Sequence, residues 1–128
     1  NQNVASFVVP VGATINMDGT AIMQGLATVF IAQMSGIDLT LFQYIQVILL
    51  AVATSIGTAA VPSAGTITLI IILQQFNLPL EAIGIILAVD RVLDMIRTSV
   101  NVTGDAAIAC IVAKTENQLD ENIFNSKA

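Results

Sequence analysis

The sequence has 128 residues, of which 55% are hydrophobic and 10% are charged, and its formal net charge is −5. A soluble domain carries about 25% charged residues, so this composition and a mean hydropathy of +0.86 indicate a membrane protein or part of one. The chain has no histidine, one cysteine and four basic residues, which excludes a His-containing triad, an internal disulfide and a basic patch for nucleic acid.

The first apolar stretch, residues 4–35, is interrupted by the polar sequence NMDGT at residues 16–20. One interpretation is a surface loop between two short helices. The other is a broken transmembrane helix, whose unwound backbone lines a cavity and offers carbonyl groups to a cation. We favour the broken helix, because polar residues in the middle of an apolar span are costly in hydrocarbon unless they serve a site.

A second apolar stretch consists of two arms, residues 41–54 and 66–76, separated by a run of small residues at 55–65. Each arm spans only about 16–21 Å, too short to cross a hydrocarbon core of about 30 Å. The pattern predicts a re-entrant helical hairpin whose tip lies near the bilayer midplane and acts as a gate. A soluble helical hairpin is the alternative, which the composition disfavours.

The third stretch, residues 80–114, is apolar but carries ionisable side chains, and it is followed by a polar tail at 115–128 that we expect to be poorly ordered. At about 100° per residue, five polar groups fall on one helical stripe about 80° wide. They are Asp90, Asp94, Arg97, Asn101 and Asp105. Asp94 and Arg97 could simply neutralise each other, but that pair does not account for the rest of the stripe, so we predict a functional site.

The chemistry of the stripe is bipolar. The planar fork of Arg97 suits a carboxylate, and Asp94, one turn away, can hold an ammonium group, so together they predict an amino acid ligand. Asn101 and Asp105, with the polar side chains of residues 16–20, offer hard oxygen ligands. Such ligands suit a small cation rather than a transition metal.

These motifs resemble one family. The sequences NMDGT at 16–20, SIGTAAVP at 55–62 and DMIRTSVNVTGD at 94–105 are similar, in order and spacing, to those of the dicarboxylate/amino acid:cation symporters, the glutamate transporter family. The resemblance implies an all-α membrane protein, in which residues 1–128 form the C-terminal part of the transport domain. The implied elements are a broken transmembrane helix, a re-entrant helical hairpin and the final transmembrane helix.

The resemblance also implies roles for individual residues. Asp94 would bind the substrate amino group and Arg97 its side-chain carboxylate, and the pocket would be completed by Thr20, Thr98, Asn101 and the backbone around Val61 and Gly65. One sodium ion would lie on Asp105 with the carbonyls of Gly12, Asn16 and Asn101. A second would use carbonyls of Thr14, Ser55, Ile56 and Thr58. A third would use the side chains of Asn16 and Asp18 with residues absent from this sequence, and Met17 would place its sulfur among these sites.

The function implied by the resemblance is sodium-coupled symport of an acidic amino acid, glutamate or aspartate, and not catalysis. Proton-coupled relatives tend to carry Asn in place of Asp105, C4-dicarboxylate relatives lack Asp94, and neutral amino acid relatives lack Arg97. The implied partners are the substrate, sodium as coupling ion and the lipid bilayer, with no other cofactor and no nucleic acid. The parent would be a homotrimer and a multi-pass protein of the cell (inner) membrane. A proton-coupled or C4-dicarboxylate symporter of the same family stays open.

Two other functions fit the sequence less well. An intramembrane aspartyl protease needs two carboxylates about 3 Å apart, whereas Asp94 and Asp105 lie about 16 Å apart along one helix. A channel is disfavoured because one pocket for an amine and a carboxylate indicates stoichiometric binding. The chain begins at Asn1 without an initiator methionine, so we expect a fragment of a longer protein that does not transport by itself. At the hairpin tip, Ala60 and Ser63 stand where the family often has Gly.

Overall fold

The computed structural model describes residues 2–58 and 64–126 of the chain. Every regular element in these residues is helical, which confirms the predicted all-α fold class. Along the chain the elements are α1 (Gln2–Ile15), α2 (Asp18–Met34), α3 (Leu41–Ile56), α4 (Ala64–Gln75), the short 3-10 helix η1 (Leu80–Ala82), α5 (Ile83–Thr115) and α6 (Glu121–Phe124). Within the described residues, no helix combines the length and the apolar character needed to cross a membrane.

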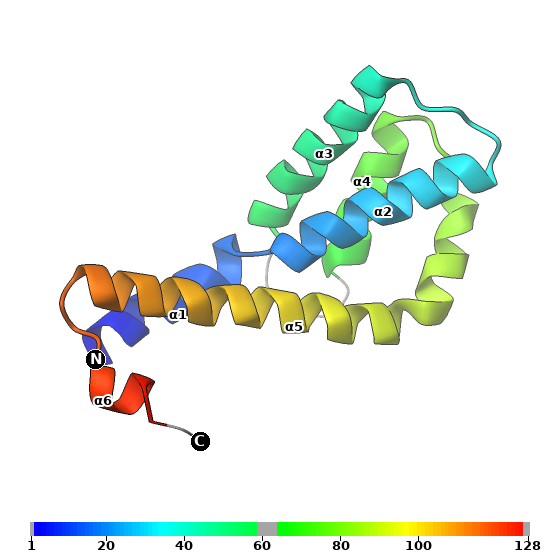
Figure 1. Ribbon diagram of the computed structural model, residues 1–128. Coiled ribbons are helices and arrows are strands. Elements are labelled where there is room, and N and C mark those ends of the chain that lie inside the picture. Colours follow the sequence, from blue (N-terminus) through cyan, green and yellow to red (C-terminus); the bar gives the residue numbers. More distant parts are fainter. Residues whose placement is uncertain (1, 59–63, 127–128) are drawn as a thin grey trace.

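Helix α5 is the longest element, and α1 and α2 pack along it one after the other (Figure 1). Helices α3 and α4 pack against α2 and against each other. Helix α2 therefore contacts three other helices, and the break between α1 and α2 lies beside α5. This arrangement brings the polar residues of the break to the polar stripe of α5.

The break itself consists of Asn16 and Met17, inside the polar sequence where we predicted it. Met17 has φ −112° and ψ 43°, and no side-chain hydrogen bond from this N-cap residue caps α2. The N–H of Gly19, in the first turn of α2, instead donates to Oδ1 of Asn101 at 2.8 Å. A residue of α5 thus supplies the side-chain cap that the N-cap residue of α2 lacks.

The hairpin arms are α3 and α4, of 16 and 12 residues, or about 24 and 18 Å in length. Helix α3 begins with a capping box, in which Thr40 Oγ1 accepts the N–H of Gln43 at 3.3 Å and Gln43 Oε1 accepts the N–H of Thr40 at 2.8 Å. The reciprocal bonds fix the start of the first arm.

The end of the first arm differs from our expectation. We placed Ser55 and Ile56 in the hairpin tip, but both belong to the last turn of α3. The hydroxyl of Ser55 donates to the carbonyl of Val52 at 2.9 Å, so its polar group is satisfied within the helix. The predictions for Ala60, Val61 and Ser63 concern positions outside the described residues.

The C-terminal tail, which we expected to be a polar and solvated end, is mostly exposed in its described residues. Its described residues include α6, a short exposed helix. Oδ1 of Asp120 accepts the N–H of Asn122 at 3.0 Å and the N–H of Ile123 at 3.2 Å. The carboxylate therefore satisfies two N–H groups at the start of this turn.

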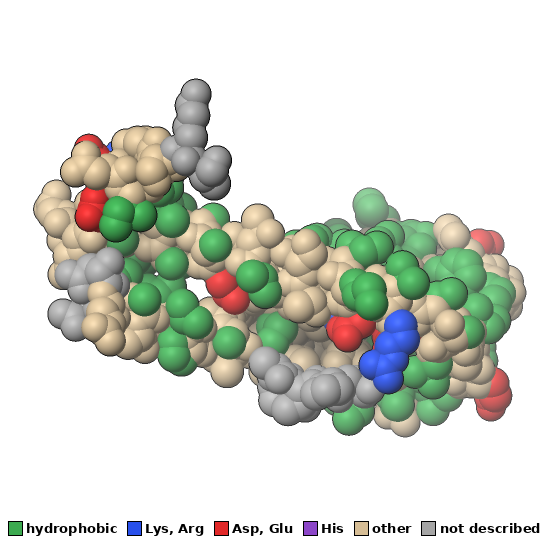
Figure 2. Space-filling model, turned by 90° about the horizontal axis from the view of Figure 1, so that it is seen from below, with side chains coloured by type: hydrophobic (Ala, Val, Ile, Leu, Met, Phe, Trp, Pro, Cys, Tyr) green, Lys and Arg blue, Asp and Glu red, His purple; other side chains and the backbone are tan. Residues whose placement is uncertain are grey.

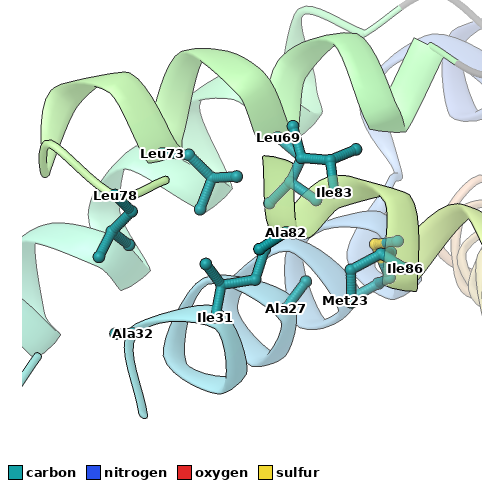
Figure 3. Packing of buried hydrophobic residues seen from close by; sticks show 10 residues of the cluster. All are labelled: Met23, Ala27, Ile31, Ala32, Leu69, Leu73, Leu78, Ala82, Ile83 and Ile86. Atoms are coloured by element: carbon teal, nitrogen blue, oxygen red, sulfur yellow. The ribbon is translucent and has the colours of Figure 1, made fainter. Parts of the chain in front are cut away.

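The apolar core lies between α2, α4 and the start of α5 (Figure 3). Ile31, Leu69 and Leu73 are fully buried there. The core cluster consists of Met23, Ala27, Ile31, Ala32, Leu69, Leu73, Leu78, Ala82, Ile83 and Ile86. This cluster packs α4 and the start of α5 against α2, and the packing sets the relative positions of the helices that carry the polar residues.

The surface is rich in apolar side chains, as the low content of charged residues predicted (Figure 2). Phe7 of α1, Leu41 of α3 and Met95 of α5 are 70%, 78% and 73% exposed. Extended exposed apolar surface is typical of chains that contact lipid or further protein.

Candidate functional site

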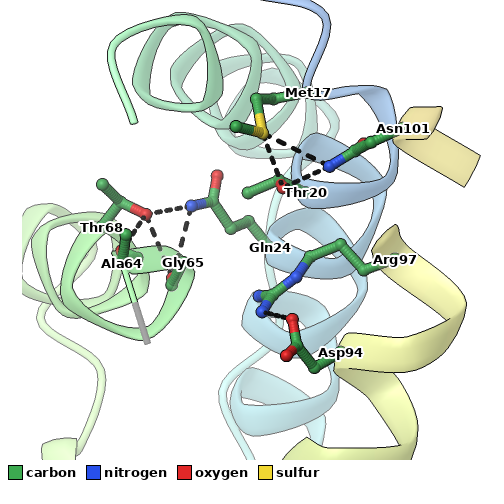
Figure 4. Close-up of polar contacts among 9 residues, drawn as sticks. All are labelled: Met17, Thr20, Gln24, Ala64, Gly65, Thr68, Asp94, Arg97 and Asn101. Carbon is green, nitrogen blue, oxygen red and sulfur yellow. Dashed lines mark hydrogen bonds and ion pairs between the residues drawn. The ribbon is translucent and has the colours of Figure 1, made fainter. Parts of the chain in front are cut away.

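The polar stripe of α5 faces the α1–α2 break and the start of α4 (Figure 4). Its central member is Arg97, which is only 8% exposed. The guanidinium Nη2 donates to Oδ1 of Asp94 on the same helix. The other terminal nitrogen, Nη1, is buried and has no hydrogen-bond partner among the described residues. A buried N–H group without a partner costs free energy, so this nitrogen keeps the capacity to donate a hydrogen bond to an acceptor.

The start of α4 closes one side of Arg97. A Cβ atom on Gly65 would collide with Nη1 of Arg97 and would lie 3.7 Å from Cγ2 of Thr20. Only glycine lets the α4 backbone approach the guanidinium this closely. The structure therefore brings together Thr20, Gly65, Asp94 and Arg97, four of the residues that the family resemblance implies for the substrate pocket.

Asn101 lies one turn further along α5 and connects to the start of α2. Its Nδ2 is 3.3 Å from Sδ of Met17 and 3.4 Å from Oγ1 of Thr20. Thr20 is 3% exposed and Met17 is 8% exposed, so these contacts are sheltered from solvent. The sulfur of Met17 thus lies beside the predicted substrate residues. Thr98, also predicted for this pocket, is exposed on α5.

A second polar cluster surrounds Asp105. Nδ2 of Asn16 donates to Oδ1 of Asp105 at 2.9 Å and to the carbonyl of Asn101 at 3.2 Å. The carbonyl of Gly12 accepts the N–H of Asn16 at 2.8 Å. A Cβ atom on Gly12 would strike the carboxylate of Asp105, so α1 and α5 are in close contact here. All four residues predicted for one sodium ion therefore lie in one cluster.

The oxygens of this cluster are those of the Asp105 carboxylate and of the Gly12 and Asn101 backbone carbonyls, and the side-chain amide of Asn16 turns its Nδ2 toward Asp105 and Asn101. Hard cations such as sodium are bound by such oxygens, so the cluster fits a small cation. The described residues contain no group of three or more His, Cys, Asp or Glu arranged to hold a metal ion. Asp18 is exposed, and it lines a pocket of about 420 Å³ together with Gly12, Asn16 and Asp105.

The residues predicted for another sodium ion are less closely associated. Helix α1 contacts α3, but Thr14 is exposed and its hydroxyl donates to the carbonyl of Val11 at 3.0 Å within α1. The carbonyl of Ser55 accepts the N–H of Thr58 at 3.1 Å. The hydroxyl of Thr58 donates to the carbonyl of Thr54 at 2.6 Å. These hydrogen bonds connect each group only to its own segment. A role of Thr14, Ser55, Ile56 and Thr58 in binding a second sodium ion stays a prediction.

One buried polar residue of the site was missed by the sequence analysis. Gln24 of α2 is fully buried, and its amide joins both arms of the hairpin. Oε1 accepts the hydroxyl of Thr54 on α3 at 3.1 Å. Nε2 donates to the hydroxyl of Thr68 and, at 3.4 Å, to the carbonyl of Gly65 on α4. Gln24 looked like an ordinary polar residue of an apolar helix, and only its helical spacing from Thr20 and Ala27 on the buried face of α2 could have marked it.

We expect Gln24→Leu to lower the melting temperature of the complete protein. Leucine has a similar volume but breaks the bonds to both arms, at a cost of about 1–3 kcal/mol. The hydroxyls of Thr54 and Thr68 keep their bonds to carbonyls of their own helices, so no larger penalty should follow. The matched control is Gln33→Leu, since Gln33 is exposed on the same helix. Equal melting temperatures for the two variants would contradict the stabilising role of Gln24.

Comparisons with known proteins all point to one family of transporters. The profile of the sodium:dicarboxylate symporter family matches residues 1–115. The chain is 50% identical over 128 residues to excitatory amino acid transporter 3 of Mus musculus, covering 99% of this chain and 24% of that protein. It is 51% identical over 112 residues to an excitatory amino acid transporter of Caenorhabditis elegans, covering 88% and 22%. It is 52% identical over 112 residues to excitatory amino acid transporter 2 of Mus musculus, covering 88% and 20%. The chain spans between a fifth and a quarter of the length of these relatives.

Proposed function

This chain belongs to the sodium:dicarboxylate symporter family, and we propose that the complete protein carries an acidic amino acid across a membrane together with sodium ions. The family is one of transporters and not of enzymes, and its coupling ion is sodium. The names of the relatives, excitatory amino acid transporters, support an amino acid as substrate.

The observation that carries the proposal is the state of Arg97. Its guanidinium is buried, one nitrogen is paired with Asp94, and the other has no partner among the described residues. A substrate carboxylate would satisfy this free N–H and the positive charge together. Asp94, with a side chain 39% exposed, remains accessible to a substrate ammonium group. An amino acid with an acidic side chain offers both groups.

We assign the remaining substrate contacts to Thr20, Gly65, Asn101, Thr98 and the backbone around Val61. Thr20, Gly65 and Asn101 are supported by their closeness to Arg97 and to one another. Thr98 follows Arg97 directly in the chain and lies on the exposed side of α5.

We assign one sodium ion to Asp105 with the carbonyls of Gly12, Asn16 and Asn101. The cation would neutralise a carboxylate that is otherwise costly at membrane depth. The carbonyls of Thr14, Ser55, Ile56 and Thr58 are proposed for a second ion. The side chains of Asn16 and Asp18 are proposed for a third.

Coupling between substrate and cation would run through Asn101. Its carbonyl faces Asn16 in the cation cluster, and its side chain contacts Thr20 and the N–H of Gly19 on the substrate side. A cation that orders Asn101 would therefore raise substrate affinity, and the substrate would raise cation affinity by the same factor.

A membrane location follows from membership of this transporter family. We further propose a multi-pass protein of the cell (inner) membrane that assembles as a homotrimer in the lipid bilayer. The exposed apolar side chains of α1, α3 and α5 support packing against lipid or against the rest of the protein.

Uptake of labelled aspartate by the complete protein in proteoliposomes tests the proposal. We expect saturable uptake driven by an inward sodium gradient and abolished when sodium is replaced by choline. Uptake driven by a proton gradient without sodium, or inhibition by succinate as strong as by unlabelled aspartate, would replace this proposal with the proton-coupled or C4-dicarboxylate alternative. Flux that does not saturate would indicate a channel.

A further inference from the structure

Two glycines allow close contact where α1 meets α5, and each lies against a polar side chain from the other segment. Gly12 of α1 lies against the carboxylate of Asp105, so that a Cβ on Gly12 would collide with Oδ1 and lie 2.9 Å from Cγ. Gly104 of α5 lies against the side chain of Asn16. A Cβ on Gly104 would be 2.5 Å from Nδ2 and 3.3 Å from Cγ and Oδ1 of Asn16. Each glycine thus leaves the space that the other segment's polar side chain fills.

The side-chain amide of Asn16, which lies against Gly104, also donates to Asp105 and so orients its carboxylate. Nδ2 of Asn16 donates to Oδ1 of Asp105 at 2.9 Å and to the carbonyl of Asn101 at 3.2 Å. The amide fixes one carboxylate oxygen and leaves the other available. A methyl group at position 104 would force the amide to move, because a contact of 2.5 Å is far shorter than van der Waals separation.

We propose that Gly104 is a positioning residue for the coupling cation, acting through Asn16. Because residue 104 has no side chain, the Asn16 amide can donate to both the Asp105 carboxylate and the Asn101 carbonyl. These two hydrogen bonds hold the carboxylate and carbonyl oxygens in the arrangement that binds the ion. This inference rests on the proposed sodium-coupled function. Hydrogen-bond partners that orient metal ligands typically change ion affinity by about 10–100-fold when they are removed.

The test measures aspartate binding to the complete purified protein by calorimetry over a series of sodium concentrations. We expect Gly104→Ala to raise the sodium concentration for half-maximal binding by about tenfold or more, with aspartate affinity restored at saturating sodium. The matched control is Gly84→Ala, since Gly84 lies in the same helix with open space around its Cβ position. That variant should keep the sodium dependence of the unmodified protein.

A double-mutant cycle separates positioning from simple helix packing. Asn16→Ala keeps the backbone carbonyl but removes the amide, and it should itself raise the sodium requirement. In the Asn16→Ala background, Gly104→Ala should add little, because the methyl group then has no amide to displace. The cycle remains informative if Gly104→Ala alone fails to fold. The double variant has room for the methyl group, so it should fold and show the same sodium dependence of aspartate binding as Asn16→Ala.

Three results would overturn the inference. The first is a sodium dependence that Gly104→Ala leaves unchanged. The second is an effect of Gly104→Ala that is equally large with and without the Asn16 amide. The third is a double variant that fails to fold although Asn16→Ala folds. Failure of the proposed function is distinguishable, because the unmodified protein would then bind aspartate without any dependence on sodium.

Discussion

Replacing Arg97 with cysteine should weaken aspartate binding to the complete protein by about 2–5 kcal/mol. The Arg97 residue is 8% exposed, and its guanidinium carries a buried nitrogen without a partner among the described residues. Its removal would leave the substrate carboxylate buried without an opposite charge, and it would also leave Asp94 unpaired. Neutral amino acids would lose nothing at this position, so their binding should be retained or gained. Calorimetric titration with aspartate and with serine measures both effects.

The control for this experiment is Arg91→Cys, which removes the same charge from an exposed position of α5. It should leave the aspartate affinity close to that of the unmodified protein, because exposed charges interact weakly. Equal aspartate affinities for Arg97→Cys and the unmodified protein would refute the assignment of Arg97 to the substrate carboxylate.

The second large effect is expected for Asp105→Asn. Asparagine keeps the size and one oxygen, and that oxygen can still accept the Asn16 amide that now bonds to Oδ1 of Asp105. The change therefore removes charge while preserving the shape of the cluster. A unit charge 4 Å from a cation contributes about 4 kcal/mol at an effective dielectric constant near 20. We expect the sodium concentration for half-maximal aspartate binding to rise at least about tenfold.

Asp38→Asn provides the matched control, because Asp38 is exposed in the segment between α2 and α3. It should not alter the sodium dependence. If Asp105→Asn also leaves the sodium dependence untouched, Asp105 is not a sodium ligand, and a proton-coupled mechanism becomes the better explanation.

Much of the fold could be predicted from local sequence alone. The polar residues at 16–20 mark the break, because Asn, Asp and Gly interrupt an apolar helical pattern. The stripe that contains Asp94, Arg97 and Asn101 follows from helical periodicity, because α5 is one continuous helix over these positions. The end of α3 was placed wrongly, since the back-bonding of the Ser55 hydroxyl to Val52 cannot be read from composition.

The candidate site shows where local sequence stops being informative. The periodicity of α5 places Asn101 and Asp105 on one face, but it does not say which segment that face meets. The structure brings Asn16 to both residues across more than eighty positions of sequence. It also reveals that Asn101 caps the start of α2 through the N–H of Gly19.

The sequence by itself thus determined the helical class, the break, the two short arms and the set of polar side chains available for a site. Only the tertiary structure decided that Gln24 ties both hairpin arms to α2 and that Gly104 faces Asn16. The physical reason is the range of the interactions. Helix formation and its interruption depend on neighbours within about one turn, whereas a buried amide or a close helix contact depends on partners that the packing of the apolar core brings together.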